Sequence, residues 1–234
     1  MKKQTKTILG IVLVLALAGI AFTYLKAPSK TDTNTITKAN SALPAITDGD
    51  WQKKGNTEVT LVEYADFQCP ACGSYAPLVK RLQDTYAGRV TFVFRHFPLG
   101  MHINALPASL AAEAAGAQGK FFEMSDKLFV GQTEWSDSKT PNDIFVRYAT
   151  ELGLDIDKFK ADIVREDLKQ KIADSYKGGV KAKVTGTPTF FLNGEKLTNP
   201  KGDTLEEVYV GFTKLIDAKL GVTNAPVVST STAQ

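Results

Sequence analysis

Cys69 and Cys72 are the only cysteines of this 234-residue chain, and Pro70 and Ala71 separate them. Two thiols at this spacing can form a structural disulfide, share a metal ion, or exchange disulfides with other proteins. A structural role is weak, because a disulfide that closes so short a ring stabilises a fold by only roughly 2 kcal/mol. A zinc or copper site would need further ligands, which only the two histidines, His96 and His102, could readily supply. The pair therefore favours redox chemistry, with no metal and no other cofactor.

The residues around the pair predict where it lies. Val59–Tyr64 is rich in β-branched residues and predicts a strand. Apolar residues then recur at helical spacing at Tyr75, Leu78, Val79, Leu82 and Tyr86. This arrangement puts Cys69 at the N-cap of a helix and Pro70 in its first turn. Free backbone amides and the helix dipole there lower a cysteine pKa from ~8.5 toward neutrality. Cys72, one turn inward, should be buried and less acidic, so Cys69 exchanges disulfides and Cys72 resolves the mixed disulfide.

Two further places in the sequence could belong to the same site. Glu63 lies on the strand that leads to Cys69, either on a solvent-facing edge or buried with a raised pKa; its immediate neighbours favour the exposed position. Asp66 is better explained as a loop or capping residue. Pro188 follows Thr187 and opens the apolar run Thr189–Leu192, which indicates an edge strand or a special turn.

The remaining elements predict an α/β fold. Val90–Phe94 indicates a second strand, and the long stretch before Thr189–Leu192 carries helix signals instead of strand signals. Asn193-Gly194 predicts a tight hairpin, and an amphipathic helix follows from Leu205 to Ile216. A right-handed β-α-β crossover would make the first two strands parallel neighbours, with helices covering the sheet and a helical subdomain inserted at about 100–184.

Residues 1–25 predict a membrane segment or an export signal. Ile8–Leu25 carries no charge and follows Lys2, Lys3 and Lys6, which is typical of a single-pass anchor with its positive flank in the cytoplasm. Small residues near Ala18 leave a cleaved signal peptide open. Either way the folded part, 51–221, is expected outside the cytoplasm: anchored in the cell membrane, or else secreted or periplasmic. Residues 26–50 indicate a flexible tether, and 222–234 a disordered tail.

Composition excludes several function classes. With 43% hydrophobic and 23% charged residues, the chain is typical of a globular protein. Its net charge of +3 is too small and too dispersed to indicate a nucleic-acid-binding protein.

In combination, four motifs resemble the DsbA-like branch of the thioredoxin superfamily, the extracytoplasmic thiol–disulfide oxidoreductases. They are Val62-Glu63-Tyr64 before Phe67-Gln68-Cys69-Pro70-Ala71-Cys72, then Phe94-Arg95-His96-Phe97-Pro98-Leu99, Gln118-Gly119-Lys120-Phe121-Phe122, and Gly186-Thr187-Pro188-Thr189-Phe190-Phe191. The resemblance implies a thioredoxin-like fold with an inserted helical subdomain, over roughly Thr57–Leu220.

The resemblance also implies roles for individual residues. Thr187–Pro188 would be cis and packed against the cysteines, where it obstructs metal capture and lets the backbone near Thr187 pair with a substrate peptide. Glu63 would be a buried acid that relays protons near Cys72. The insert would frame an apolar groove to which Phe121, Phe122 or Trp135 could contribute, although core packing is the favoured role of each. Ala71 stands where enterobacterial DsbA has His, so we expect a Cys69 pKa between ~7 and ~3.5 and an intermediate potential.

The expected function is an oxidase that donates its disulfide to unfolded or reduced exported proteins. A quinone-linked membrane reoxidase, or another membrane redox partner, would restore the disulfide, and the protein is expected to be a monomer. Two alternatives remain: a reductase or isomerase fed by a membrane electron donor, and a tethered metal-binding chaperone that uses the two thiolates.

Overall fold

The computed structural model describes residues 43–222, and a five-stranded sheet forms their centre, in the order β1-β3-β2-β4-β5. The strands are β1 (Trp51–Lys53), β2 (Thr60–Ala65), β3 (Thr91–His96), β4 (Thr189–Leu192) and β5 (Glu195–Lys196). The helices are α2 (Pro70–Thr85), α3 (Ala105–Gly116), α4 (Phe121–Val130), α5 (Gln132–Trp135), α6 (Pro141–Glu151), α7 (Ile156–Asp162), α8 (Glu166–Lys181) and α9 (Leu205–Leu220). The expected anchor or signal, most of the tether and nearly all of the tail lie outside the described residues.

The predicted β-α-β unit is present. β2 and β3 are parallel neighbours joined through α2, and β4 runs antiparallel to β2 on its other side. The predicted Asn193-Gly194 hairpin then leads into β5. Both turn residues have positive φ, 50° and 81°, which is the backbone geometry that an Asn-Gly turn accommodates.

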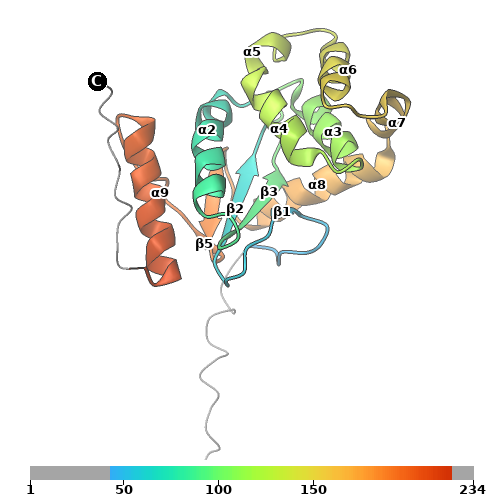
Figure 1. The fold of residues 1–234 in the computed structure, drawn as a ribbon. Helices are drawn as coiled ribbons and strands as arrows, with labels where there is room; N and C mark the ends of the chain where they lie inside the picture. Colours follow the sequence, from blue (N-terminus) through green and yellow to red (C-terminus); the bar gives the residue numbers. More distant parts are fainter. Residues whose placement is uncertain (1–42, 223–234) are drawn as a thin grey trace, which may run out of the picture. The chain divides into compact units, whose positions relative to one another are not determined.

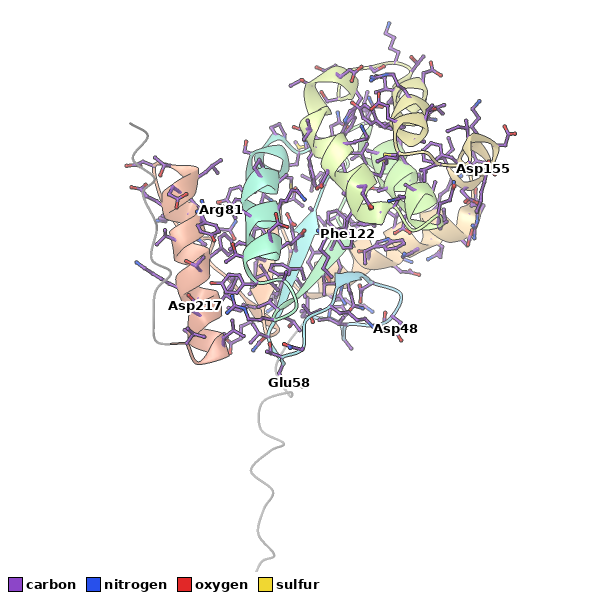
Figure 2. The ribbon with its side chains drawn as sticks, viewed as in Figure 1. Asp48, Glu58, Arg81, Phe122, Asp155 and Asp217 are labelled. Atoms are coloured by element: carbon purple, nitrogen blue, oxygen red, sulfur yellow. The ribbon has the colours of Figure 1, made fainter. Side chains whose placement is uncertain are left out.

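Helices α2 and α9 cover one face of the sheet (Figure 1). Leu61, Phe92 and Phe190 point from three adjacent strands into an apolar cluster with Leu82 of α2 and Phe212 of α9. Polar contacts join the same two helices at their margins. Tyr86, which follows α2, donates a hydrogen bond to Asp217 at 2.8 Å, and Arg81 of α2 pairs with Glu206. Figure 2 labels Arg81 and Asp217 on facing sides of this helix pair.

Helix α8 packs on the opposite face of the sheet. Its approach is close because Gly179 has no side chain: a Cβ there would lie 2.6 Å from Phe97 and 3.0 Å from Tyr64. Tyr64, Val93 and Phe191 complete the apolar cluster on this face.

Helices α3 to α7 form the inserted subdomain, between β3 and β4 in the sequence. Its cluster contains the alanines of α3 together with Trp135, Phe145 and Phe159, all buried. The small alanine side chains let neighbouring helices approach, and the large aromatic rings fill the remaining space. Cys69 and Cys72 belong to the same cluster, so the redox helix packs directly on the insert. Within residues 43–222, no helix has the length and apolar character that would let it cross a bilayer.

The structure corrects the start of the domain in two ways. The strand β1, which the sequence analysis did not predict, pairs antiparallel with β3. The expected tether, 26–50, also ends earlier, since residues 43–50 pack on the domain. Arg95 holds them: its guanidinium donates to the Asp50 carboxylate at 2.8 and 3.0 Å and to the carbonyls of Pro44 and Ala45 at 3.0 and 2.9 Å. Leu43 and Ile46 also pack against the apolar cluster on the α8 face. The polar composition of 26–50 as a whole gave no sign of this attachment.

Candidate active site

Cys69 occupies the N-cap of α2, as the sequence predicted. Its φ and ψ of −69° and 121° are extended, and Pro70 is the first helical residue. The Cys69 carbonyl accepts the first helical hydrogen bond from the Gly73 N–H at 3.1 Å, and its own N–H donates to the Asp66 carbonyl at 3.1 Å. Strand β2 and the tight turn after Ala65 therefore deliver the cysteine to the positive end of the helix.

The two sulfurs have different surroundings. Both cysteines are free thiols; Cys69 is 7% exposed and Cys72 is fully buried. A hydrogen bond from the Cys72 thiol is the largest of the causes that lower the pKa of Cys69 to about 5, against the opposing effect of burial. The Thr187 side chain and the N–H groups of Ala71 and Cys72 lower the pKa further, so the value falls inside the interval of ~3.5 to ~7 expected from the sequence. Burial raises the pKa of Cys72 strongly, and Cys69 and Glu63 raise it further.

Thr187 lies against Cys69, although 118 residues separate the two in the sequence. Strand pairing explains the contact: Thr189 of β4 is opposite Tyr64 of β2, so the residues just before β4 reach the level of the turn just after β2. The Thr187–Pro188 bond is cis. The Cys69 Sγ donates to the Thr187 carbonyl at 3.4 Å. The cis bond that the resemblance implied, and the position of Thr187 beside Cys69, are therefore present.

Glu63 is buried, which corrects the exposed position that its local sequence favoured. It lies in β2 between Phe94 of β3 and Phe190 of β4, and only 8% of it is exposed. Burial raises the pKa of Glu63 to about 8, so the carboxyl is largely protonated at neutral pH. It lines a cavity of about 40 Å³ between α2 and α4, where Lys80 and Ser125 are among the other lining residues. That space is sufficient for a water molecule.

The other sequence candidates have structural roles. Asp66 is buried in the turn before Cys69, where its carboxylate accepts from the Gln68 and Leu99 N–H groups, each at 2.8 Å. Phe121 and Trp135 are core residues with 2% and no exposure, as favoured; Phe122 is half-buried and lines the Glu63 cavity.

The histidines do not join the thiols. His96 Nε2 is 3.0 Å from the Glu113 carboxylate, and His102 Nδ1 is 2.6 Å from that of Asp66. Among residues 43–222, no three His, Cys, Asp or Glu side chains come together as a metal site.

Sequence reasoning missed the polar residues that attach the redox motif to the insert. Gln132 of α5 donates to the carbonyls of Phe67 and Cys69 at 2.7 and 3.0 Å. Gln68 accepts from the Asn104 N–H at 2.6 Å and donates to the Ser136 carbonyl at 2.8 Å. No local pattern marks these residues, because each contact joins segments far apart in the sequence.

An apolar groove begins beside the redox helix. Its volume is about 360 Å³, and its lining includes Gly73 and Pro77 of α2 with Phe129 and Val130 of α4. Val130 is 88% exposed. Because Val130 is exposed and apolar, and lines the same groove as Gly73, it is a suitable contact for an unfolded chain.

The thioredoxin family model matches residues 51–210 of the chain. Among curated proteins, a Na(+)/H(+) antiporter, NhaA 3 of Salinispora tropica, is 43% identical over 143 residues, which cover 61% of this chain and 21% of the antiporter. NhaA 1 of Mycobacterium sp. (strain KMS) is 37% identical over 147 residues, covering 61% and 23%. The chain therefore spans about a fifth of the length of the curated relatives it matches.

Solved structures share the fold. Oxidised BdbD from Bacillus subtilis superposes with a TM-score of 0.65 and 21% identity, over 77% of this chain and 97% of BdbD. The alpha-DsbA1 of Wolbachia pipientis gives 0.64 and 22%, over 78% and 96%. A thioredoxin-like oxidoreductase from Silicibacter pomeroyi DSS-3 gives 0.56 and 26%, over 72% and 94%. The expected thioredoxin-like fold with a helical insert is confirmed.

Proposed function

We propose that this chain, which belongs to the thioredoxin family, is a thiol–disulfide oxidoreductase of the DsbA-like kind that donates disulfides to exported proteins. The contrast between the two sulfurs carries this proposal. A thiolate is a better leaving group when the pKa of its thiol is lower. The Cys69 pKa of about 5 therefore makes Cys69 the sulfur that forms the mixed disulfide with a client and is later released from it.

The reaction starts from the Cys69–Cys72 disulfide. A client thiolate attacks the Cys69 sulfur, and the electron pair of the broken S–S bond passes to Cys72. A second client thiolate then attacks the client sulfur of the mixed disulfide and releases Cys69 as a thiolate. The client thereby loses two electrons and two protons and gains a disulfide, while Cys69 and Cys72 become the dithiol.

Glu63 is the proposed proton donor to Cys72 in the first step. Burial disfavours a Cys72 thiolate, so the electron pair that arrives there must be matched by a proton. A carboxyl with a pKa of about 8 holds a proton at neutral pH and releases it to a stronger base. Water in the cavity that Glu63 lines would restore the proton from solvent. Reoxidation reverses the path, with the Glu63 carboxylate accepting the Cys72 proton.

The low pKa of Cys69 favours oxidation of clients over their reduction. Relative to a thioredoxin-like ~7, a value of about 5 stabilises the reduced protein at pH 7 by roughly 2 kcal/mol. That energy moves the potential about 50 mV above thioredoxin's ~−270 mV. The dithiol is then stable enough for clients to give up their electrons to it, and a membrane redox partner, quinone-linked or other, would take them away.

Client binding would use the surface on both sides of Cys69. Backbone groups near Thr187 lie beside the sulfur, where an extended client segment can pair with them. The groove from Gly73 to Val130 would accept an apolar side chain of the same segment. We further propose that residues 1–25 act as a membrane anchor or cleaved signal, so that the domain works outside the cytoplasm.

The test is the reduction potential of the Cys69–Cys72 pair together with refolding of a reduced client. We expect a potential well above thioredoxin's ~−270 mV and refolding that Cys69→Ala abolishes. Cys72→Ala should instead accumulate a mixed disulfide with an oxidised client, because Cys69 attacks and nothing resolves the adduct. A potential at or below ~−270 mV would identify a reductase. Stoichiometric copper binding by the reduced protein would favour a metal chaperone.

A further inference from the structure

The side chain of Gln132 connects the inserted subdomain to the backbone on both sides of Cys69. Its Nε2 group donates one hydrogen bond to the Phe67 carbonyl at 2.7 Å and another to the Cys69 carbonyl at 3.0 Å. Both N–H bonds of the amide are thus used on the redox motif. The carbonyl of Cys69 is also the first acceptor of α2, through the Gly73 N–H.

Gln132 is itself held firmly by the insert. Trp135, in the same short helix, is fully buried and donates from its indole to the Leu128 carbonyl at 2.9 Å. Glu134 accepts a hydrogen bond from the Tyr148 hydroxyl at 2.8 Å. Helix α5 is therefore fixed to α4 and α6, and the Gln132 side chain extends from a rigid base.

The redox helix leaves room for this amide. A Cβ on Gly73 would lie 2.8 Å from Gln132 Oε1 and 3.2 Å from its Cδ, so any larger residue at position 73 would displace the glutamine. On the other side of Cys69, the Thr187 carbonyl is 3.4 Å from the sulfur. Cys69 therefore lies between two anchors: Gln132 acts on its backbone and Thr187 on its sulfur.

We propose that Gln132 is a positioning residue for Cys69, through which the insert sets the orientation of the first turn of α2 around the attacking sulfur. Gln132 holds two peptide planes through their carbonyls, that of Phe67 before Cys69 and that of Cys69 itself. Their orientation determines how the N–H groups of Ala71 and Cys72 face the sulfur, and those groups help to lower the Cys69 pKa. The Gln132 hydrogen bonds go to backbone carbonyls and not to the sulfur, so its effect on the thiolate is indirect.

Other contacts keep the motif attached when Gln132 is replaced. Gln68 bonds to Asn104 and to Ser136, and Asn104 also donates to the Trp135 carbonyl at 3.2 Å. A variant that lacks the Gln132 amide should therefore keep its fold and lose only the local orientation.

The experiment is an ultraviolet titration of the Cys69 thiolate in Gln132→Ala, with the equilibrium between the protein and glutathione measured alongside. We expect the Cys69 pKa to rise by about half to one unit, the size of a weakened helix-terminus interaction. The equilibrium with glutathione should become threefold to tenfold less oxidising. Gln132→Glu should shift both further, because a carboxylate repels the two carbonyls and the thiolate.

Gln118→Ala is the matched control. Gln118 is also a glutamine of the insert with two backbone hydrogen bonds, to the Asp155 carbonyl at 3.1 Å and from its N–H at 2.9 Å, and it does not contact the redox motif. Its loss should leave the Cys69 pKa unchanged. Gln132→Met, which keeps the length of the side chain without its donors, should reproduce the shift if Gln132→Ala does not fold.

The proposal is overturned if Gln132→Ala and Gln132→Met titrate like the wild type, or if Gln118→Ala shifts the pKa equally. Both readouts are independent of the direction in which the protein moves electrons in the cell. A protein that proves to be a reductase therefore leaves this result standing, and the two proposals fail separately.

Discussion

Two buried glutamates show how differently one residue type behaves in two regions of this molecule. Glu63, on β2 beside the redox helix, is 8% exposed and has its pKa raised to about 8 by burial. Glu113, on α3, is 1% exposed, and burial acts to raise its pKa as well. Instead its pKa is lowered, because its hydrogen bond to His96 and its interactions with His96 and Lys171 outweigh burial.

The neighbours of each carboxyl explain the difference. Glu113 accepts from the Trp51 indole at 2.7 Å and from Lys171 at 2.8 Å, in addition to its contact with His96. Glu63 lies between the aromatic residues Phe94 and Phe190 on the adjacent strands. Burial sets the energetic cost of the charge, and the donors decide whether the charge forms. The paired acid thus joins β1, β3, α3 and α8, whereas the acid between the two aromatic residues keeps its proton at neutral pH.

The largest expected effect is that of Glu113→Ala. It leaves the buried His96 ring and the Trp51 indole without their partner, and removes the ion pair of the partly exposed Lys171. Together these losses should lower the free energy of unfolding by about 3–5 kcal/mol. Urea unfolding at pH 7 measures this loss. Glu123→Ala, which removes a half-exposed acid paired with Lys120, should cost less than about 1 kcal/mol. Equal losses in the two variants would remove the distinction between the paired buried acid and a surface acid.

Glu63→Gln should have the opposite sign. The folded-state pKa of Glu63 is raised, so its contribution to stability is fully present below the unfolded value of 4.5 and is lost as the pH rises toward 8. Because each pH unit in that window changes the stability of wild type by about 1.4 kcal/mol, the stability of the variant relative to wild type should grow by about 3–4 kcal/mol between pH 5 and pH 8. Urea midpoints at pH 5 and pH 8 measure it, and parallel behaviour of the two proteins would contradict the raised pKa.

The same substitution should slow the exchange chemistry. Without a proton donor for Cys72, formation of the mixed disulfide, the step in which Cys72 leaves, should be about 10- to 100-fold slower, within the range of general acid–base catalysis. Wild type should show a pH dependence of this step with an inflection near the Glu63 pKa of about 8, and Glu63→Gln should lack it. Stopped-flow kinetics on a client peptide gives the profile. Glu113→Gln serves as control and should retain the inflection.

Trp51→Phe should have the smallest effect. A phenyl ring can keep the stack on Phe121, where the centroids are 4.4 Å apart, while the indole donor to Glu113 and part of the ring packed beside Gly116 are lost. The expected cost is about 1 kcal/mol. Acid unfolding should also begin at a higher pH, because the stability from a lowered carboxyl pKa is present above the unfolded value and disappears as the pH falls through the folded one. An unchanged acid midpoint would show that the indole does not help to hold the Glu113 charge.

Local patterns were enough to predict the redox helix and its position. The strand before Cys69, the proline after it and the apolar spacing that follows all lie within one short segment, so Cys69 at the N-cap and the buried Cys72 could be predicted. The Asn193-Gly194 turn and the helical insert were predictable for the same reason. Thr187 and Pro188 could be placed beside Cys69 only through the family resemblance, because the pairing of β4 with β2 is not visible in either segment.

Contacts between distant segments escaped local reasoning. Glu63 looks exposed beside its neighbours in the sequence, but it is buried by Phe94 and by Phe190, which β3 and β4 bring from either side. Gln132 reaches the redox motif from 63 residues away. Arg95 is an ordinary charged residue in the sequence, and only the folded sheet shows that it fastens residues before β1.

The Arg95 clamp has a mechanical consequence. All five guanidinium N–H groups of Arg95 donate hydrogen bonds, the fifth to the Tyr64 hydroxyl at 3.1 Å. The segment from Pro44 to Asp50 is therefore attached to β3 through a single side chain. A force applied to the chain before Leu43 would act on these Arg95 hydrogen bonds before it reached α2. The redox helix α2 would thus keep its geometry when a force acts on the N-terminal side of the domain.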